Sequence, residues 1–276
     1  MAVLTDYHVH LRPDEPDTPP ERYFTAENAE RYLEAAREAE VAELGVSEHV
    51  YRFRQALEVW RHPFWVESAL DDLDAYCEFV RTTPLRLGIE ADLVPGAEDR
   101  IASLLDARHF DYVIGSVHFV GDFAVDHEEY DAWEAIGDAD AIWGRYFGLL
   151  AQAARSGLFD VLAHPDLVKV WGRGRPAPER DPRHYYEPAV EAIAESGIAV
   201  EVSTSGLRKP AGELYPSPGF AEMCVDAGAA FSLSSDAHRP EEVGHGYGRA
   251  IEFLRGLGVG EICVFERRER RLVELG

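Results

Sequence analysis

Cysteine, lysine and long apolar runs are scarce in this 276-residue chain, and each scarcity excludes a class of protein. The three cysteines, Cys77, Cys224 and Cys263, are far apart and form no CxxC pair. They therefore indicate reduced thiols rather than a disulfide framework. No basic segment followed by an apolar stretch opens the chain, and no run approaches the length of a membrane span. We expect a cytoplasmic protein with no membrane partner.

Basic residues are also few. The sequence holds 51 acidic residues against 27 lysines and arginines, a formal net charge of −24. Such a surface repels phosphate backbones, so nucleic acid is not expected as the main partner. Most of this charge is interpreted as a solvated acidic shell, and the basic run "ERRERR" near the C-terminus as another solvated face.

Apolar runs that end in polar residues alternate with helical patterns along the chain. Helical spacing begins at residue 26 with Thr25 as its N-cap, and a second helix is expected from about Val66 to Val80. This alternation is typical of a parallel α/β sheet or barrel, and no linker interrupts it. We expect one domain over residues 1–276. The predicted strands lie near Leu4, Leu44, Leu87, Val113, Val161, Val200 and Phe231.

Eight possible metal ligands stand at or just past the ends of these strands. Because the carboxyl ends of barrel strands form one rim, these side chains are expected to converge there. Imidazole and carboxylate ligands without a thiolate suit Zn, Mn or Fe. The eight residues are His8, His10, His49, Glu90, His118, His164, Asp236 and His238.

The spacing of two pairs strengthens this hypothesis. His8 and His10 are two residues apart, so their side chains point to the same side of a strand, and Asp236 and His238 repeat the spacing. A single histidine at a strand end is more often a hydrogen-bonded structural residue, and Glu90 alone could cap a helix. The coincidence of eight candidates favours a multinuclear metal site.

The remaining histidines receive the simpler interpretation of surface residues, although two lie in long loops that could fold over the rim, His127 and His184. The aromatic residues of "VWRHPFW", Trp60, Phe64 and Trp65, are expected to pack in the core or to wall a pocket. The surface set is His62, His109, His127, His184 and His245.

Six segments resemble the motifs of the polymerase and histidinol phosphatase (PHP) superfamily, in the family's order and from residue 6 to about 250. They are "YHVH", "SEH", "GIEAD", "IGSVHF", "AHPD" and "SDAHRPEEVG". The closest likeness is to the monofunctional histidinol-phosphatase branch. The resemblance implies a distorted (β/α)7, TIM-like barrel with two or three divalent ions, commonly Zn, Fe or Mn.

Carried over residue by residue, the resemblance implies three metal positions. His8, His10, Glu90 and Asp236 would hold the first ion. Glu90 would bridge to a second ion at His118 and His164, and His49 with His238 would serve a third. Many members have a further histidine where this chain has Pro16. A neighbouring acid, Asp14, Glu15 or Asp17, is the possible replacement; alternatively the third site is weak or empty.

Two ions bridged by Glu90 would lie roughly 3.5–4 Å apart, and a hydroxide shared between them would be the nucleophile for a phosphate monoester. Arg208 is the first candidate to bind the phosphate, with Lys169 and Arg239 as further candidates. The proton for the leaving group could come from Asp236, from His238 or from a bound water.

The resemblance implies hydrolysis of L-histidinol phosphate in histidine biosynthesis, with a small molecule as the partner. A related phosphoesterase acting on a nucleotide or phosphotyrosine is the alternative. An amidohydrolase is disfavoured because the chain has only two lysines, Lys169 and Lys209, and neither ends a strand. A non-catalytic PHP module is disfavoured by the full ligand set. The oligomeric state is not readable from the sequence.

Overall fold

A computed structural model describes residues 3–14, 18 and 22–276. Its centre is a seven-stranded sheet in the order β1-β2-β3-β4-β7-β8-β9, and every neighbouring pair is parallel. The seven predicted strands and the barrel class are thereby confirmed. The strands are β1 (Thr5–Asp6), β2 (Glu43–Val46), β3 (Arg86–Asp92), β4 (Tyr112–Ser116), β7 (Val161–Leu162), β8 (Ala199–Ser203) and β9 (Phe231–Ser234).

The first and last strands meet, so that the sheet forms a nearly closed barrel. Just beyond β1 and β9, Val9 and Ala237 form a parallel bridge, and the His10 N–H donates to the Ala237 carbonyl at 2.8 Å. The buried Asp6 carboxylate accepts the backbone N–H of Ser235 at 2.9 Å and that of Gly244 at 3.2 Å. This seam brings residues from the two ends of the chain to the same edge.

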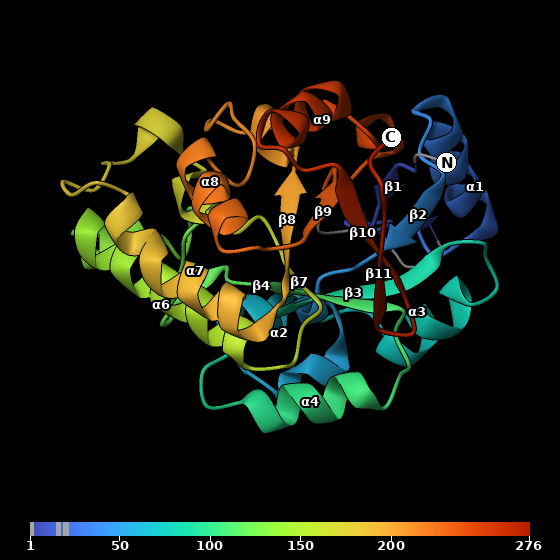
Figure 1. Cartoon of the computed structure of the whole chain (residues 1–276). Coiled ribbons are helices and arrows are strands. Elements are labelled where there is room, and N and C mark those ends of the chain that lie inside the picture. Colours follow the sequence, from blue (N-terminus) through green and yellow to red (C-terminus); the bar gives the residue numbers. More distant parts are fainter. Residues whose placement is uncertain (1–2, 15–17, 19–21) are drawn as a thin grey trace.

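Helices surround the barrel on its outer side (Figure 1), and the longest pair, α6 and α7, pack against each other. Thr25 caps the first helix as predicted, because its side chain accepts the backbone N–H of Asn28. The helices are α1 (Ala26–Glu38), α2 (Pro63–Ser68), α3 (Leu73–Val80), α4 (Glu98–Asp106), α5 (Ala132–Ile136), α6 (Ala139–Arg155), α7 (Arg183–Ser196), α8 (Pro218–Asp226) and α9 (Tyr247–Gly256).

The prediction of a single helix from Val66 to Val80 is wrong, because this segment forms two helices, α2 and α3, with a break between them. Between them the Asp71 backbone pairs with Phe53 in a parallel bridge, which takes the chain out of helical geometry. Asp72 then starts α3, because its carboxylate accepts the N–H groups of Asp74 and Ala75 at 3.0 Å each. The interruption places α2 beside the short turn Val50–Arg52 that follows β2.

Apolar side chains fill the part of the barrel near the amino ends of its strands. Tyr7, Tyr112 and Phe265 pack in this cluster, with ring centroids 4.9–6.4 Å apart. Tyr112 lies so close to β3 that a Cβ on Gly88 would be 2.2 Å from its ring, which requires glycine there. The opposite end, where the strands finish, is left for polar side chains.

A hairpin of β10 (Glu261–Glu266) and β11 (Glu269–Glu274) follows the last helix and runs beside β9. The "ERRERR" run forms its turn and much of β11; its charged side chains are mostly exposed, but the extended structure was not predicted. Small strands β5 (Phe119–Val120) and β6 (Phe123–Ala124) form a second hairpin after β4. No helix in the described ranges is long and apolar enough to cross a bilayer.

Candidate metal centre and its cavity

The eight predicted ligands come together at the carboxyl ends of the strands. His8 and His10 follow β1, His49 follows β2, and Glu90 lies within β3. The others follow β4, β7 and β9. Their ligand atoms form four groups that share members, and within each group the ligand atoms lie within 4.8 Å of one another. The groups are His8–His10–Asp236, His8–Glu90–His164, His49–Glu90–His118 and His10–His49–His238.

Glu90 is the centre of this cluster. Its Oε1 lies 3.1 Å from His164 Nε2 and 3.4 Å from His118 Nε2. Its Oε2 lies 3.3 Å from His8 Nε2 and also contacts His49 Nδ1. Complete burial raises the pKa of Glu90, but the nearby histidines outweigh burial and hold that pKa well below its usual range. The side chain is therefore a carboxylate that two sets of imidazoles share.

Several buried atoms of the cluster have no hydrogen-bond partner within the described part of the chain. They include Nε2 of His8, both ring nitrogens of His10 and Oε2 of Glu90. Leaving buried polar atoms unpaired costs about 1–3 kcal/mol each, so such a concentration calls for a missing partner. Cations would satisfy these lone pairs, and nitrogen with oxygen ligands suits divalent transition metals. The residues present thus fit a metal centre.

A ring of outer carboxylates orients the imidazoles, and the sequence analysis did not identify them. Glu201 accepts from His8 Nδ1 at 2.9 Å, and Asp92 accepts from His118 Nδ1 at 2.6 Å. Because each Nδ1 donates to a carboxylate oxygen, the opposite ring nitrogen, Nε2, is turned towards Glu90 in both histidines. Two sequence signals could have found them: Asp92 lies two residues after Glu90 on the same strand, and Glu201 interrupts the apolar run "AVEVS".

Two of the candidate ligands have strained backbones. His164 has φ 22° and Asp236 has φ 52°, values that non-glycine residues seldom adopt. Contacts on either side hold them: the His164 N–H donates to Glu201 at 2.6 Å, and Arg208 Nη2 donates to the Asp236 carbonyl at 2.9 Å. Such backbone strain is found at sites where side-chain position matters more than local stability.

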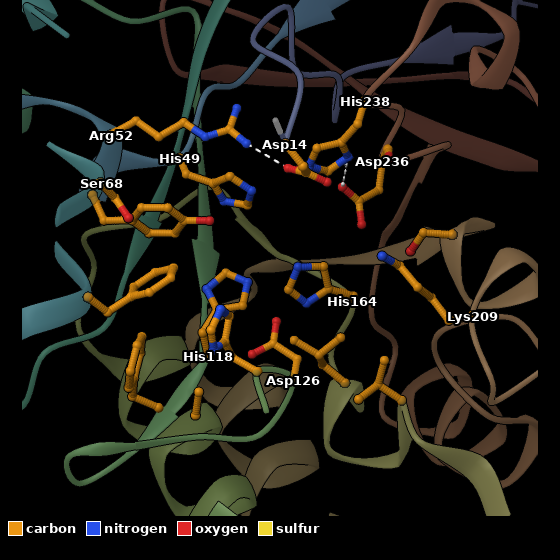
Figure 2. A pocket seen from close by; sticks show the side chains of 18 of the residues that line it. Asp14, His49, Arg52, Ser68, His118, Asp126, His164, Lys209, Asp236 and His238 are labelled. Carbon is orange, nitrogen blue, oxygen red and sulfur yellow. Dashed lines mark hydrogen bonds and ion pairs between the residues drawn. The ribbon is translucent and has the colours of Figure 1, made fainter. Parts of the chain in front are cut away.

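A cavity of about 670 Å³ opens over the cluster (Figure 2). One wall is aromatic: Tyr51 stacks on His49 with ring centroids 4.6 Å apart, and Phe64 packs edge-on against Tyr51. Acidic side chains also line the cavity, among them Asp14, Glu67, Asp126 and Glu129. The cavity can therefore enclose a small molecule with an apolar or cationic portion.

One acid stands where the resemblance suggested a replacement ligand. Asp14 Oδ1 lies 3.4 Å from His238 Nε2, and it also accepts from Arg52 Nη2 at 2.8 Å. Its carboxylate thus lies beside the group of His10, His49 and His238. Glu15 and Asp17 lie outside the described residues.

None of the three predicted phosphate-binding residues lines the cavity. Arg208 Nη2 donates to the carbonyls of Ser235 and Asp236 at 2.9 Å each. Lys169 Nζ lies 2.9 Å from Asp166 and donates to the Leu214 carbonyl at 2.8 Å. Arg239 lines a neighbouring recess that His238 shares. Three basic side chains that were not predicted as phosphate-binding residues do line the cavity: Arg12, Arg52 and Lys209.

The other histidines differ from expectation in one case. His62 is buried rather than on the surface: its Nδ1 accepts the Phe64 N–H at 3.2 Å, so the ring caps α2 and packs against Trp60. His127 lines the cavity, whereas His184 lies on α7 beside Arg180. His109 and His245 are exposed, and Trp65 is in the core.

Comparison with known proteins gives consistent relatives. The chain is 34% identical over 277 residues to a protein of Deinococcus radiodurans named a probable histidinol-phosphatase, covering 98% of this chain and 99% of that one. It is 27% identical over 183 residues to the histidinol-phosphatase of Bacillus subtilis, covering 61% of this chain and 68% of the relative.

Among solved structures, a Lactococcus lactis histidinol phosphate phosphatase, complexed with zinc, L-histidinol and phosphate, superposes with a TM-score of 0.70. It is 18% identical, and the match covers 98% of this chain and 100% of that one, which shows a shared fold. The PHP domain profile matches residues 24–205. On these matches, and on a barrel whose strand ends gather the motif residues, the chain belongs to the PHP family.

Proposed function

We propose that this protein is a metal-dependent phosphomonoesterase that hydrolyses L-histidinol phosphate to L-histidinol and phosphate, a step of histidine biosynthesis. The observation that carries the proposal is the Glu90-centred cluster of six histidines beneath a cavity of about 670 Å³. The near full-length likeness to a protein named as such a phosphatase supports the substrate. Residues 1–276 would form one catalytic domain acting in the cytoplasm.

The residues suggest how the ions are held. We assign His8, His10, Glu90 and Asp236 to one ion, and Glu90 with His118 and His164 to a second. His49 and His238 would serve a third, with Asp14 as the replacement ligand. Zn, Mn and Fe are the metals that this ligand set favours. When bound, such ions neutralise phosphate charge and lower the pKa of a water molecule, so that a nucleophile is available near neutral pH.

The chain's own contribution is orientation and exclusion of water. Glu201 and Asp92 keep the Nε2 lone pairs of His8 and His118 directed at the centre, so little reorganisation is needed at reaction. The aromatic wall of Tyr51 and Phe64 shields one side of the cavity. Asp236 and His238 reach the same space from one loop, and we assign proton transfer to the leaving oxygen to this pair.

The cavity's charges fit the substrate's other end. L-Histidinol phosphate carries an ammonium and an imidazole, and the carboxylates of Asp126, Glu129 and Glu67 face the cavity. A nucleotide would place a second anionic or neutral portion against these acids. The histidinol ester is therefore favoured over a nucleotide.

The test is phosphate release by the purified protein from L-histidinol phosphate, an aryl phosphate and a nucleotide, with added Mn or Zn and with a chelator control. We expect chelator-sensitive turnover that is fastest on the histidinol ester. Equal turnover of all three esters would support metal-dependent phosphomonoester hydrolysis but would refute the assignment of L-histidinol phosphate as the substrate. No release from any ester would refute the proposed activity.

A further inference from the structure

Three basic side chains line the cavity in the described part of the chain, and two of them are neutralised. Arg12 pairs with Asp71 at 2.9 Å, and Arg52 pairs with Glu48 at 2.8 Å. Both arginines are buried at about 5% exposure. Lys209 is exposed, and its side chain forms no hydrogen bond or ion pair with any described residue. Among these three side chains, Lys209 is therefore the one whose charge is available to an anion in the cavity.

Two other candidates for anion binding, Arg208 and Lys169, form contacts within the protein instead. Arg208, next to Lys209, turns towards the barrel seam and donates to two backbone carbonyls. Lys169 lies between Asp166 and Glu213, at 2.9 and 3.1 Å. A phosphate could recruit either only by displacing these partners.

The backbone that carries Lys209 is fixed although the side chain is not. The residue follows the short turn Ser205–Arg208, and its carbonyl accepts the Gly212 N–H at 3.0 Å. The Ala211 N–H donates to Val170 at 2.9 Å, which attaches this loop to the one after β7. A Cβ on Gly172 would be 2.5 Å from the Pro210 carbonyl oxygen, so the two loops pack closely.

Figure 2 shows the direction of the side chain. The amino end of Lys209 points into the cavity towards His164 and Asp236, across from Asp14. The carboxylates of Glu67, Asp126 and Glu129 line other parts of the same wall. An anion entering the cavity is therefore repelled by these carboxylates and attracted to the side that holds Lys209.

We propose that Lys209 binds the phosphate oxygens of the substrate and thereby fixes which way round the ester lies. Its ammonium would donate to oxygens that are not held by the cluster, while the cationic end of the substrate faces the carboxylates. The inference rests on the proposed function, since it assigns one end of that substrate. A lysine is suited to this task because its three donors rotate on a flexible stem.

The experiment compares Lys209→Met, Lys209→Arg and the control Arg249→Met, which removes the same charge from an exposed position on α9. For Lys209→Met we expect kcat/KM to fall about 10- to 100-fold, mainly through KM, because one charge-assisted contact is lost. The inhibition constant for inorganic phosphate should rise by a similar factor. Lys209→Arg should recover part of the loss, and metal content should match the unaltered protein in all three.

Phosphate binding by calorimetry to the metal-loaded protein separates the two proposals. If the unaltered protein binds phosphate but hydrolyses no ester, the proposed function fails, and weaker binding by Lys209→Met still supports this contact. If the unaltered protein is active and Lys209→Met matches it in KM and phosphate affinity, the role of Lys209 is refuted alone. Absence of both activity and phosphate binding would overturn both.

Discussion

Replacing Glu90 by Gln tests the centre of the site most directly. The substitution keeps the shape of the side chain but removes its charge, and it places an amide donor among imidazoles that now present lone pairs. Oε1 contacts two histidines and Oε2 contacts His8 and His49, so one change weakens two ligand groups together.

The expected magnitude follows from this sharing. Loss of an outer carboxylate such as Glu201 costs about 10- to 100-fold in metal affinity. Glu90 contacts ligands of both groups itself, so its loss should exceed that range. If the ions supply about 4 kcal/mol of charge stabilisation at the transition state, kcat should fall about 1,000-fold.

The assay is metal content by mass spectrometry beside turnover of L-histidinol phosphate, for Glu90→Gln and for Glu201→Gln as the matched carboxylate control. We expect bound metal and kcat to fall in both variants, and much further in Glu90→Gln. Circular dichroism checks that both fold. A Glu90→Gln protein that keeps its metal and its kcat would refute the assignment of Glu90 as the shared ligand.

Four further predictions concern the remaining site and the fold. His118→Ala should abolish turnover with an unchanged circular dichroism spectrum; full activity and metal content would remove it from the ligand set. Arg208→Ala should lower kcat and metal content more than it raises KM, because the guanidinium holds the Asp236 carbonyl. If the variant instead only raises KM, and loses about 2–4 kcal/mol of transition-state stabilisation in kcat/KM, Arg208 contacts the phosphate. A chelator should lower the melting temperature, and Zn or Mn should restore it, since ligands of the native state stabilise it; an unchanged transition would contradict metal binding. Asp72→Ala should reduce the free energy of unfolding by about 1 kcal/mol in urea titrations without changing kcat, because it removes the cap of α3.

The arrangement of the barrel could be predicted because its signals are local. Each strand is a short apolar run, and parallel strands finish at one rim, so residues such as His49 and His164 could be placed together without knowing their distances. The helix interruption was harder, because the pairing of Asp71 with Phe53 is a tertiary contact. The N-cap Asp72 was the one local sign of it.

The C-terminal hairpin escaped prediction for a specific reason. Its turn is made by Arg267 and Arg268, both with positive φ, where Asn-Gly or Asp-Gly would be the usual signal. Side-chain direction was equally unreadable: Arg208 and Lys209 are adjacent in the sequence, yet one turns to the barrel seam and the other to the cavity.

The barrel seam has a consequence for the order in which the site can form during synthesis. His8 and His10 leave the ribosome more than two hundred residues before Asp236 and His238. A nascent chain that ends before β9 therefore lacks part of two of the four ligand groups. Ions captured afterwards would connect residues that follow β1 with a residue that follows β9, and their binding free energy would add to the stability of the folded chain. The supply of metal would then affect how long the folded protein survives as well as its catalytic rate.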